Sequence, residues 1–124
     1  QYEPEIRNTV DVLSDSDWDA IHTGMRMVVE NTKEFDGFPI EAAGKTGTAQ
    51  EDLKRPNHAL FVGYAPYDNP EISIATRIAN GYTSHNAAEV SKKILAYYFK
   101  VEDADSLLNG QAENINATSN GVND

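Results

Sequence analysis

The sequence has 124 residues, the size of one modest domain, and its hydrophobic content of 40% and charged content of 24% are ordinary for a globular protein. A formal net charge of −10 argues against nucleic acids and anionic membrane surfaces as partners. Because the chain has no cysteine, disulfides, thiolate zinc sites and a cysteine nucleophile are excluded within it.

The first predicted element is an amphipathic helix over residues 14–32, SDSDWDAIHTGMRMVVENT. Apolar side chains recur along it at helical spacing and are expected to face a core: Trp18, Ile21, Met25, Val28 and Val29. Ser14 or Ser16 can cap its start, and the aspartates that follow suit the positive end of the helix dipole. Gly37 and Pro39 then break the pattern.

Three strands are predicted next, over residues 43–50, 58–65 and 71–79. The middle segment, HALFVGYA, is an almost continuous apolar run, which predicts a strand buried on both faces. The last segment alternates between apolar side chains on one face and small or polar ones on the other. The connections 51–57 and 66–70 are polar and of hairpin length, so both strand pairs are expected to be antiparallel.

A second helix is predicted over residues 86–99. Its core-facing side chains are expected to be Ala87, Val90, Ile94, Leu95 and Tyr98, with Lys92 and Lys93 facing water. Beyond it, the composition holds too few large apolar residues to offset the entropy of ordering. We therefore assign residues 1–103 to the folded unit and predict that the acidic polar tail, 104–124, is disordered.

The predicted fold class is α+β, an antiparallel sheet flanked by helices. A middle strand buried on both faces needs more helical cover than two helices supply, so the unit is expected to be an incomplete domain. The start, QYEPEIRNTV, lacks an initiator methionine and is expected to continue from a longer polypeptide.

The stretch AAGKTGTAQ (42–50) contains Gly44-Lys45-Thr46, which has the spelling of the end of a phosphate-binding loop. Such a loop needs a glycine five residues earlier, where this chain has Pro39, and a helix immediately after it. A polar loop and another strand follow instead, so we reject this interpretation.

The same stretch contains Lys45-Thr46-Gly47-Thr48, which suits an edge strand beside a cleft. The lysine supplies a positive charge, two hydroxyls can hold a substrate carboxylate, and the glycine allows close approach of a ligand. A peptide unit of such a strand can also donate its N–H to an oxyanion.

The succession of a helix, GKTGTAQ, a hairpin loop, HALFVGYAP and an alternating strand resembles the C-terminal part of the transpeptidase domain of penicillin-binding proteins, from roughly Leu13 to Lys100. Lys-Thr-Gly is the third motif of that family of active-site serine acyltransferases. Thr-Ala-Gln and HALFVGYAP look more like class B transpeptidases than β-lactamases. The resemblance implies the C-terminal portion of a serine β-lactamase/penicillin-binding-protein transpeptidase-like fold.

The resemblance implies a peptidoglycan D,D-transpeptidase that cross-links the cell wall without a cofactor and is trapped by β-lactams. Lys45 would set the electrostatics and proton network around the nucleophilic serine. Thr46 and Thr48 would hold the terminal carboxylate of the peptide or drug, and Gly47 would keep the strand flat. The backbone N–H of Thr48 would be the second oxyanion donor.

The nucleophile motif of that family, Ser-x-x-Lys, occurs nowhere in this chain. Ser84-His85-Asn86 has the spelling of the second motif, Ser-x-Asn, but follows Lys-Thr-Gly and is better explained by helix capping. The chain alone is therefore predicted to be inactive. Its expected partners are the missing N-terminal part of the same domain, peptidoglycan stem peptides and β-lactam antibiotics. The expected location is the extracytoplasmic face of the bacterial membrane, with the anchor outside this chain.

Two alternatives stay open. One is a β-lactamase or β-lactam-sensor domain of the same fold, and the other is a non-catalytic module whose sheet edge recruits an extended peptide. His22, His58 and His85 lack ligand spacing, so no metal site is expected, and His58 is expected to be structural.

Overall fold

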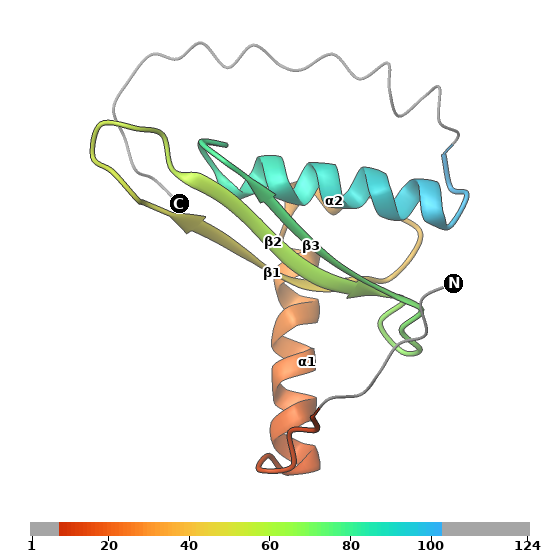
Figure 1. Ribbon diagram of the computed structural model, residues 1–124. Coiled ribbons are helices and arrows are strands. Elements are labelled where there is room, and N and C mark those ends of the chain that lie inside the picture. Colours follow the sequence, from red (N-terminus) through yellow and green to blue (C-terminus); the bar gives the residue numbers. More distant parts are fainter. Residues whose placement is uncertain (1–7, 103–124) are drawn as a thin grey trace.

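The computed structural model describes residues 8–102, which form a three-stranded antiparallel sheet with two α-helices (Figure 1). The elements in chain order are α1 (Asp15–Glu30), the short 3-10 helix η1 (Lys33–Phe35), β1 (Ala43–Ala49), β2 (His58–Ala65), β3 (Ile72–Ile78) and α2 (Ser84–Tyr98). The predicted order of helix, three strands and helix is confirmed. The tail predicted over residues 104–124 lies outside the described residues.

The strands lie in the order β1-β2-β3, and both pairs are antiparallel, as the hairpin connections predict. Thr46 of β1 is paired with Phe61 of β2, and Lys45 is paired with Val62. Because directly opposed residues of an antiparallel pair point to the same side, the sheet has two distinct faces. We call the side of Phe61, which α2 covers, the helix face, and the side of Val62 the open face.

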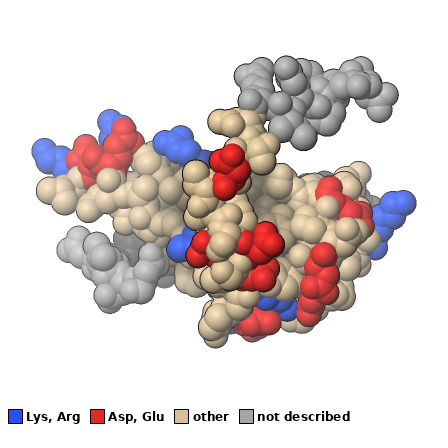
Figure 2. Space-filling model, turned by 90° about the horizontal axis from the view of Figure 1, so that it is seen from below, with Lys and Arg blue, Asp and Glu red and all other residues tan. Residues whose placement is uncertain are grey.

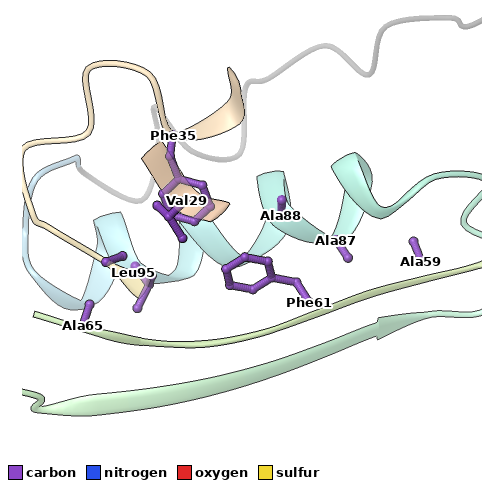
Figure 3. Packing of buried hydrophobic residues seen from close by; sticks show 9 residues of the cluster. Val29, Phe35, Ala59, Phe61, Ala65, Ala87, Ala88 and Leu95 are labelled. Atoms are coloured by element: carbon purple, nitrogen blue, oxygen red, sulfur yellow. The ribbon is translucent and has the colours of Figure 1, made fainter. Parts of the chain in front are cut away.

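The core lies on the helix face, around Phe61 (Figure 3). The Phe61 ring is 1% exposed and stacks on Phe35 of η1, with ring centroids 5.6 Å apart. From α2, the side chains buried in this layer are Ala87, Ala88, Ser91, Leu95 and Ala96. The buried Ser91 hydroxyl is hydrogen-bonded to Thr76 of β3 at 2.8 Å and donates to the Ala87 carbonyl at 2.7 Å.

The predicted core face of α2 is only partly right. Ala87 and Leu95 are buried, whereas Val90, Ile94 and Tyr98 are 40%, 46% and 47% exposed. Small residues occupy the buried stripe instead, because they let the helix backbone come close to the sheet and the Phe61 ring.

The prediction that β2 is buried on both faces is wrong for the described part of the chain. Its helix face is buried, but on the open face Leu60 and Tyr64 are half-buried and Val62 is 48% exposed. Tyr64 at the end of the strand is partly covered by His22 of α1, with ring centroids 5.7 Å apart. The middle of the open face is thus an apolar surface that residues 8–102 leave in water.

Helix α1 begins with a capping box in which Ser14 and Asp17 satisfy each other's backbone N–H groups. The hydrogen bond from the Ser14 hydroxyl lowers the pKa of the Asp17 carboxyl. At the other end, the Arg26 guanidinium donates to the Ala42 carbonyl at 3.2 Å and contacts Glu41, which ties the helix to the start of β1.

The predicted core face of α1 is also only partly right, since Val29 alone is buried and Ile21 is 43% exposed. Figure 1 shows why: only the C-terminal end of α1 lies against the sheet, and its N-terminal half projects away. Seen from the projecting end, acidic side chains gather over the middle of the molecule (Figure 2). None of the helices described between residues 8 and 102 has the length and apolar character that a membrane span needs.

Candidate functional site

Gly44-Lys45-Thr46 lies within strand β1, and a hairpin connection to β2 follows it. A phosphate-binding loop would place these residues between a strand and a helix, so the structure agrees with rejecting that interpretation. β1 is an edge strand of the described sheet, because only β2 pairs with it there. The motif therefore lies along a sheet edge, as the sequence predicts.

Lys45 extends from the open face of β1 and is exposed. Its Nζ donates to the backbone carbonyl of Thr46 at 2.6 Å, so the ammonium group turns back toward the strand. Backbone groups two residues apart in a strand point the same way, so the Thr48 N–H lies on the same side of β1 as that carbonyl. The cation and the predicted oxyanion donor are therefore on one side of the strand.

The side chains of Thr46 and Thr48 point to the helix face and are half-buried. The Thr48 hydroxyl accepts a hydrogen bond from the backbone N–H of Ser84 at 3.2 Å. Ser84 is the first residue of α2, whose initial N–H groups have no partner within the helix. Accepting this bond leaves the hydroxyl proton of Thr48 available to a further acceptor.

The start of α2 differs from the predicted start at residue 86. The helix begins two residues earlier because Thr83 is the N-cap, its hydroxyl accepting from the His85 N–H. Asn86 Nδ2 donates to the Gly81 carbonyl at 2.8 Å, so Ser84-His85-Asn86 does serve the helix start. The contact of Ser84 with Thr48 cannot be predicted from the sequence, since nothing local in it shows which strand the helix start touches.

Gly47 lies between the two threonines, opposite Leu60. A methyl group added at Gly47 would be 3.5 Å from Leu60 Cβ, an ordinary van der Waals contact. The fold of the described residues therefore accepts alanine at this position, and nothing within residues 8–102 requires glycine there.

His58, the first residue of β2, is buried and makes hydrogen bonds through both ring nitrogens. Nδ1 accepts from the Asn80 N–H at 3.0 Å, and Nε2 is 2.6 Å from a Glu51 carboxylate oxygen. A nitrogen that accepts carries no proton, so these partners assign the neutral ring with its proton on Nε2, donating to Glu51. That hydrogen bond lowers the pKa of Glu51.

The other histidines lie elsewhere: the His22 ring packs at a tilt against Trp18, and His85 Nδ1 is 3.0 Å from Glu34. In the part of the chain that the structure describes, no three histidine or acidic side chains come together as metal ligands would.

A hollow of about 200 Å³ lies between the end of α1 and η1, away from the β1 motif. Arg26, Val29, Phe35 and Phe38 contribute to its walls. The Arg26 charge is already engaged by Glu30 and Glu41. The β1 motif is a better candidate site, because it brings a cation, two hydroxyls and a backbone N–H within four consecutive residues of an edge strand of the described sheet.

Comparison with known proteins agrees with the arrangement of these elements. The family model described as the penicillin binding protein transpeptidase domain matches residues 3–96. The chain is 37% identical over 101 residues to the peptidoglycan D,D-transpeptidase MrdA of Acinetobacter baumannii, a match that covers 68% of the chain and 15% of that relative.

Solved structures show the same similarity. Pseudomonas aeruginosa PBP2 in complex with WCK 5153 matches with a TM-score of 0.67 and 32% identity, over 79% of this chain and 23% of that one. Penicillin-binding protein 2B of Streptococcus pneumoniae matches with a TM-score of 0.69 and 28% identity, over 82% of this chain and 18% of that one. The chain thus spans a small part of the length of each.

Proposed function

The chain belongs to the penicillin-binding protein transpeptidase domain family, and we propose that it supplies the C-terminal wall of the active site of a peptidoglycan D,D-transpeptidase. The α+β fold, with its antiparallel sheet and two helices, is that of the solved relatives. The observation that carries the proposal is the edge strand β1, which presents Lys45, the Thr48 N–H and two threonine hydroxyls within four consecutive residues.

The proposed reaction is acyl transfer through a serine supplied outside this chain. The serine oxygen attacks the carbonyl carbon of the penultimate D-alanine of a stem peptide. The bond to the terminal D-alanine breaks, and D-alanine leaves as the free amine after taking up a proton. The acyl group then passes from the serine oxygen to an amine of a neighbouring strand, which loses a proton. A β-lactam would acylate the same serine, and the reaction would stop at this acyl-enzyme.

Each site residue has a proposed part in this step. Lys45 supplies positive charge beside the serine and its proton network. The N–H of Thr48 donates to the oxyanion of the tetrahedral intermediate, where a preorganised donor acts most strongly. The hydroxyls of Thr46 and Thr48 hold the terminal carboxylate, and Gly47 lets the substrate lie against the strand. We place this activity at the outer face of the cell membrane, where peptidoglycan is cross-linked.

Labelled penicillin tests the function directly. The full-length protein that contains this chain is expected to form a covalent adduct on a serine outside residues 1–124. The 124-residue chain alone is expected to form none, because it contains no Ser-x-x-Lys. Absence of adduct on the full-length protein would favour the peptide-binding module, and rapid release of hydrolysed drug would favour a β-lactamase. An adduct on the isolated chain would refute the assignment of the nucleophile.

Thr46→Val in the full-length protein tests the carboxylate role. Valine keeps the β-branched shape but removes the hydroxyl from a half-buried position, so stability is expected to change little. Acylation by a penicillin with a free carboxylate is expected to slow about 10- to 100-fold, since a hydrogen bond to a charged group contributes about 1.5–3 kcal/mol. The penicillin ester, which lacks that charge, is expected to lose much less.

Thr23→Val on the exposed surface of α1 is the matched control and is expected to change neither rate. The decisive quantity is the ratio of the acylation rates of acid and ester. Equal slowing of both ligands by Thr46→Val would show that the hydroxyl does not hold the carboxylate.

A further inference from the structure

The turn between β3 and α2, residues 79–83, has an unusual backbone. Asn80 and Tyr82 lie in the left-handed region, with φ of +54° and +67°, on either side of Gly81. Asparagine tolerates this region, but a bulky tyrosine seldom adopts it. Such conformations persist only where surrounding contacts hold them, and they concentrate near functional sites.

Three backbone N–H groups join this turn and the first residue of α2 to the hairpin formed by β1, β2 and their connection. The Asn80 N–H donates to His58 Nδ1 at 3.0 Å, and the Tyr82 N–H donates to the Asn57 carbonyl at 3.0 Å. Two residues further on, the Ser84 N–H donates to the Thr48 hydroxyl. The bonds at Asn57 and His58 therefore set the position of the turn that delivers Ser84 to Thr48.

His58 is the one side chain among these anchors whose chemistry can be changed without touching β1. It is 9% exposed, and its two nitrogens serve different segments: Nδ1 holds the turn, while Nε2 reaches Glu51 in the β1–β2 connection. The lowered pKa of Glu51 agrees with a hydrogen bond donated by Nε2–H. The Arg77 charge acts in the same direction on the Glu51 carboxylate.

The Thr48 hydroxyl has one proton to donate, and the Ser84 bond decides where that proton points. An N–H that donates into one lone pair leaves the O–H directed elsewhere, toward an acceptor such as a carboxylate. Without the bond, the hydroxyl is free to rotate and to accept from a ligand instead of donating to it.

We propose that His58 is a positioning residue for the carboxylate site: through Nδ1 and the Asn80 N–H it fixes the turn 79–83, and thereby the Ser84 N–H that orients the Thr48 hydroxyl. This inference rests on the proposed function. It means that a buried histidine outside the Lys-Thr-Gly motif contributes to selectivity for anionic ligands.

Two substitutions separate the two ring nitrogens. His58→Asn places an amide oxygen where Nδ1 stands, so it keeps the acceptor for Asn80 and loses the contact with Glu51. His58→Gln places its amide group where Nε2 stands, so it keeps the contact with Glu51 and loses the acceptor for Asn80. Both substitutions replace the imidazole ring with a neutral amide group, so the two variants have side chains of the same polarity.

The measurement is the ratio of acylation rates for a penicillin and its ester, in the full-length protein. His58→Gln is expected to lower this ratio about tenfold, because small misplacements of a positioned group have effects of that order or larger. His58→Asn is expected to retain most of the wild-type ratio. A purely structural role of the ring would slow acid and ester alike and leave the ratio unchanged in both variants.

Amide hydrogen exchange over residues 80–84 supplies a readout that does not depend on activity. Exchange there is expected to be faster in His58→Gln than in His58→Asn, whether or not the melting temperatures differ. Equal ratios and equal exchange in the two variants would overturn the inference while leaving the proposed function intact. A wild-type protein that penicillin does not acylate would overturn the proposed function itself, and the role of His58 with it.

Discussion

Lys45→Met is expected to slow the acylation of the full-length protein by labelled penicillin about 10²- to 10⁴-fold, the range in which positioned groups that assist proton transfer act. In free energy of activation this corresponds to about 3–5 kcal/mol. The reason is local. Lys45 is the only basic residue of β1, and its Nζ lies against the Thr46 carbonyl, on the side of the strand where the Thr48 N–H points.

The same substitution is expected to leave the melting temperature nearly unchanged. Lys45 is exposed, and losing one surface hydrogen bond has a small effect on the free energy of unfolding. Lys54→Met, in the exposed β1–β2 connection, is the matched control for loss of one positive charge and should acylate at the wild-type rate. A Lys45→Met protein that reacts as fast as the control would remove Lys45 from the proposed site.

The hydrophobic pattern predicted both α-helices and the three strands of residues 8–102, because the period of the apolar residues differs between helix and strand, but it did not predict the short 3-10 helix η1. It predicted the buried faces less well. On α2 the large side chains Val90 and Ile94 point to water, while the alanines and Ser91 lie against the sheet. A pattern of large apolar residues does not reveal a helix that packs through small ones, and Ser91 can be buried because Thr76 and the Ala87 carbonyl satisfy its hydroxyl.

The open face of β2 shows a second limit. The run from Leu60 to Tyr64 has the composition of a strand covered on both faces, yet Val62 is 48% exposed among the described residues. The apolar sequence pattern indicates a strand suited to burial on both faces. The structure shows only how far residues 8–102 bury it. This chain spans only 15% to 23% of the length of its relatives, so in those proteins other parts of the polypeptide are available to cover such a face.

For the candidate site, the local arrangement on β1 could be predicted from the sequence, but the contacts that support it could not. Four consecutive residues, Lys45 to Thr48, suffice to define a strand edge with one cation and two hydroxyls, and the structure places them on such an edge. The contact of Thr48 with Ser84 spans 36 positions of sequence. It depends on a left-handed turn at a tyrosine, which no local preference predicts.

Two alanine substitutions in β1 are expected to separate folding from substrate binding. Gly44→Ala is expected to reduce stability, whereas Gly47→Ala is expected to reduce acylation. At Gly44, an added methyl group would overlap the Phe61 ring and lie 2.8 Å from the Val62 carbonyl oxygen. The backbone cannot move away without disturbing the β1–β2 pairing, so Gly44→Ala is expected to reduce the free energy of unfolding by about 1–3 kcal/mol or more. The measurement is thermal or denaturant unfolding of the full-length protein.

At Gly47, the added methyl group meets Leu60 alone among residues 8–102, at ordinary contact distances of 3.5 Å and 3.7 Å. The backbone there is not in the left-handed region, so Gly47→Ala is expected to keep or slightly raise stability, by up to about 1 kcal/mol. Acylation by penicillin is nevertheless expected to fall about 100-fold, because the methyl group displaces a ligand lying along the strand by roughly an ångström. A stable Gly47→Ala protein that reacts at the wild-type rate would show that substrate does not lie against β1 at this residue, and the assignment of Gly47 to the substrate-binding surface would be wrong.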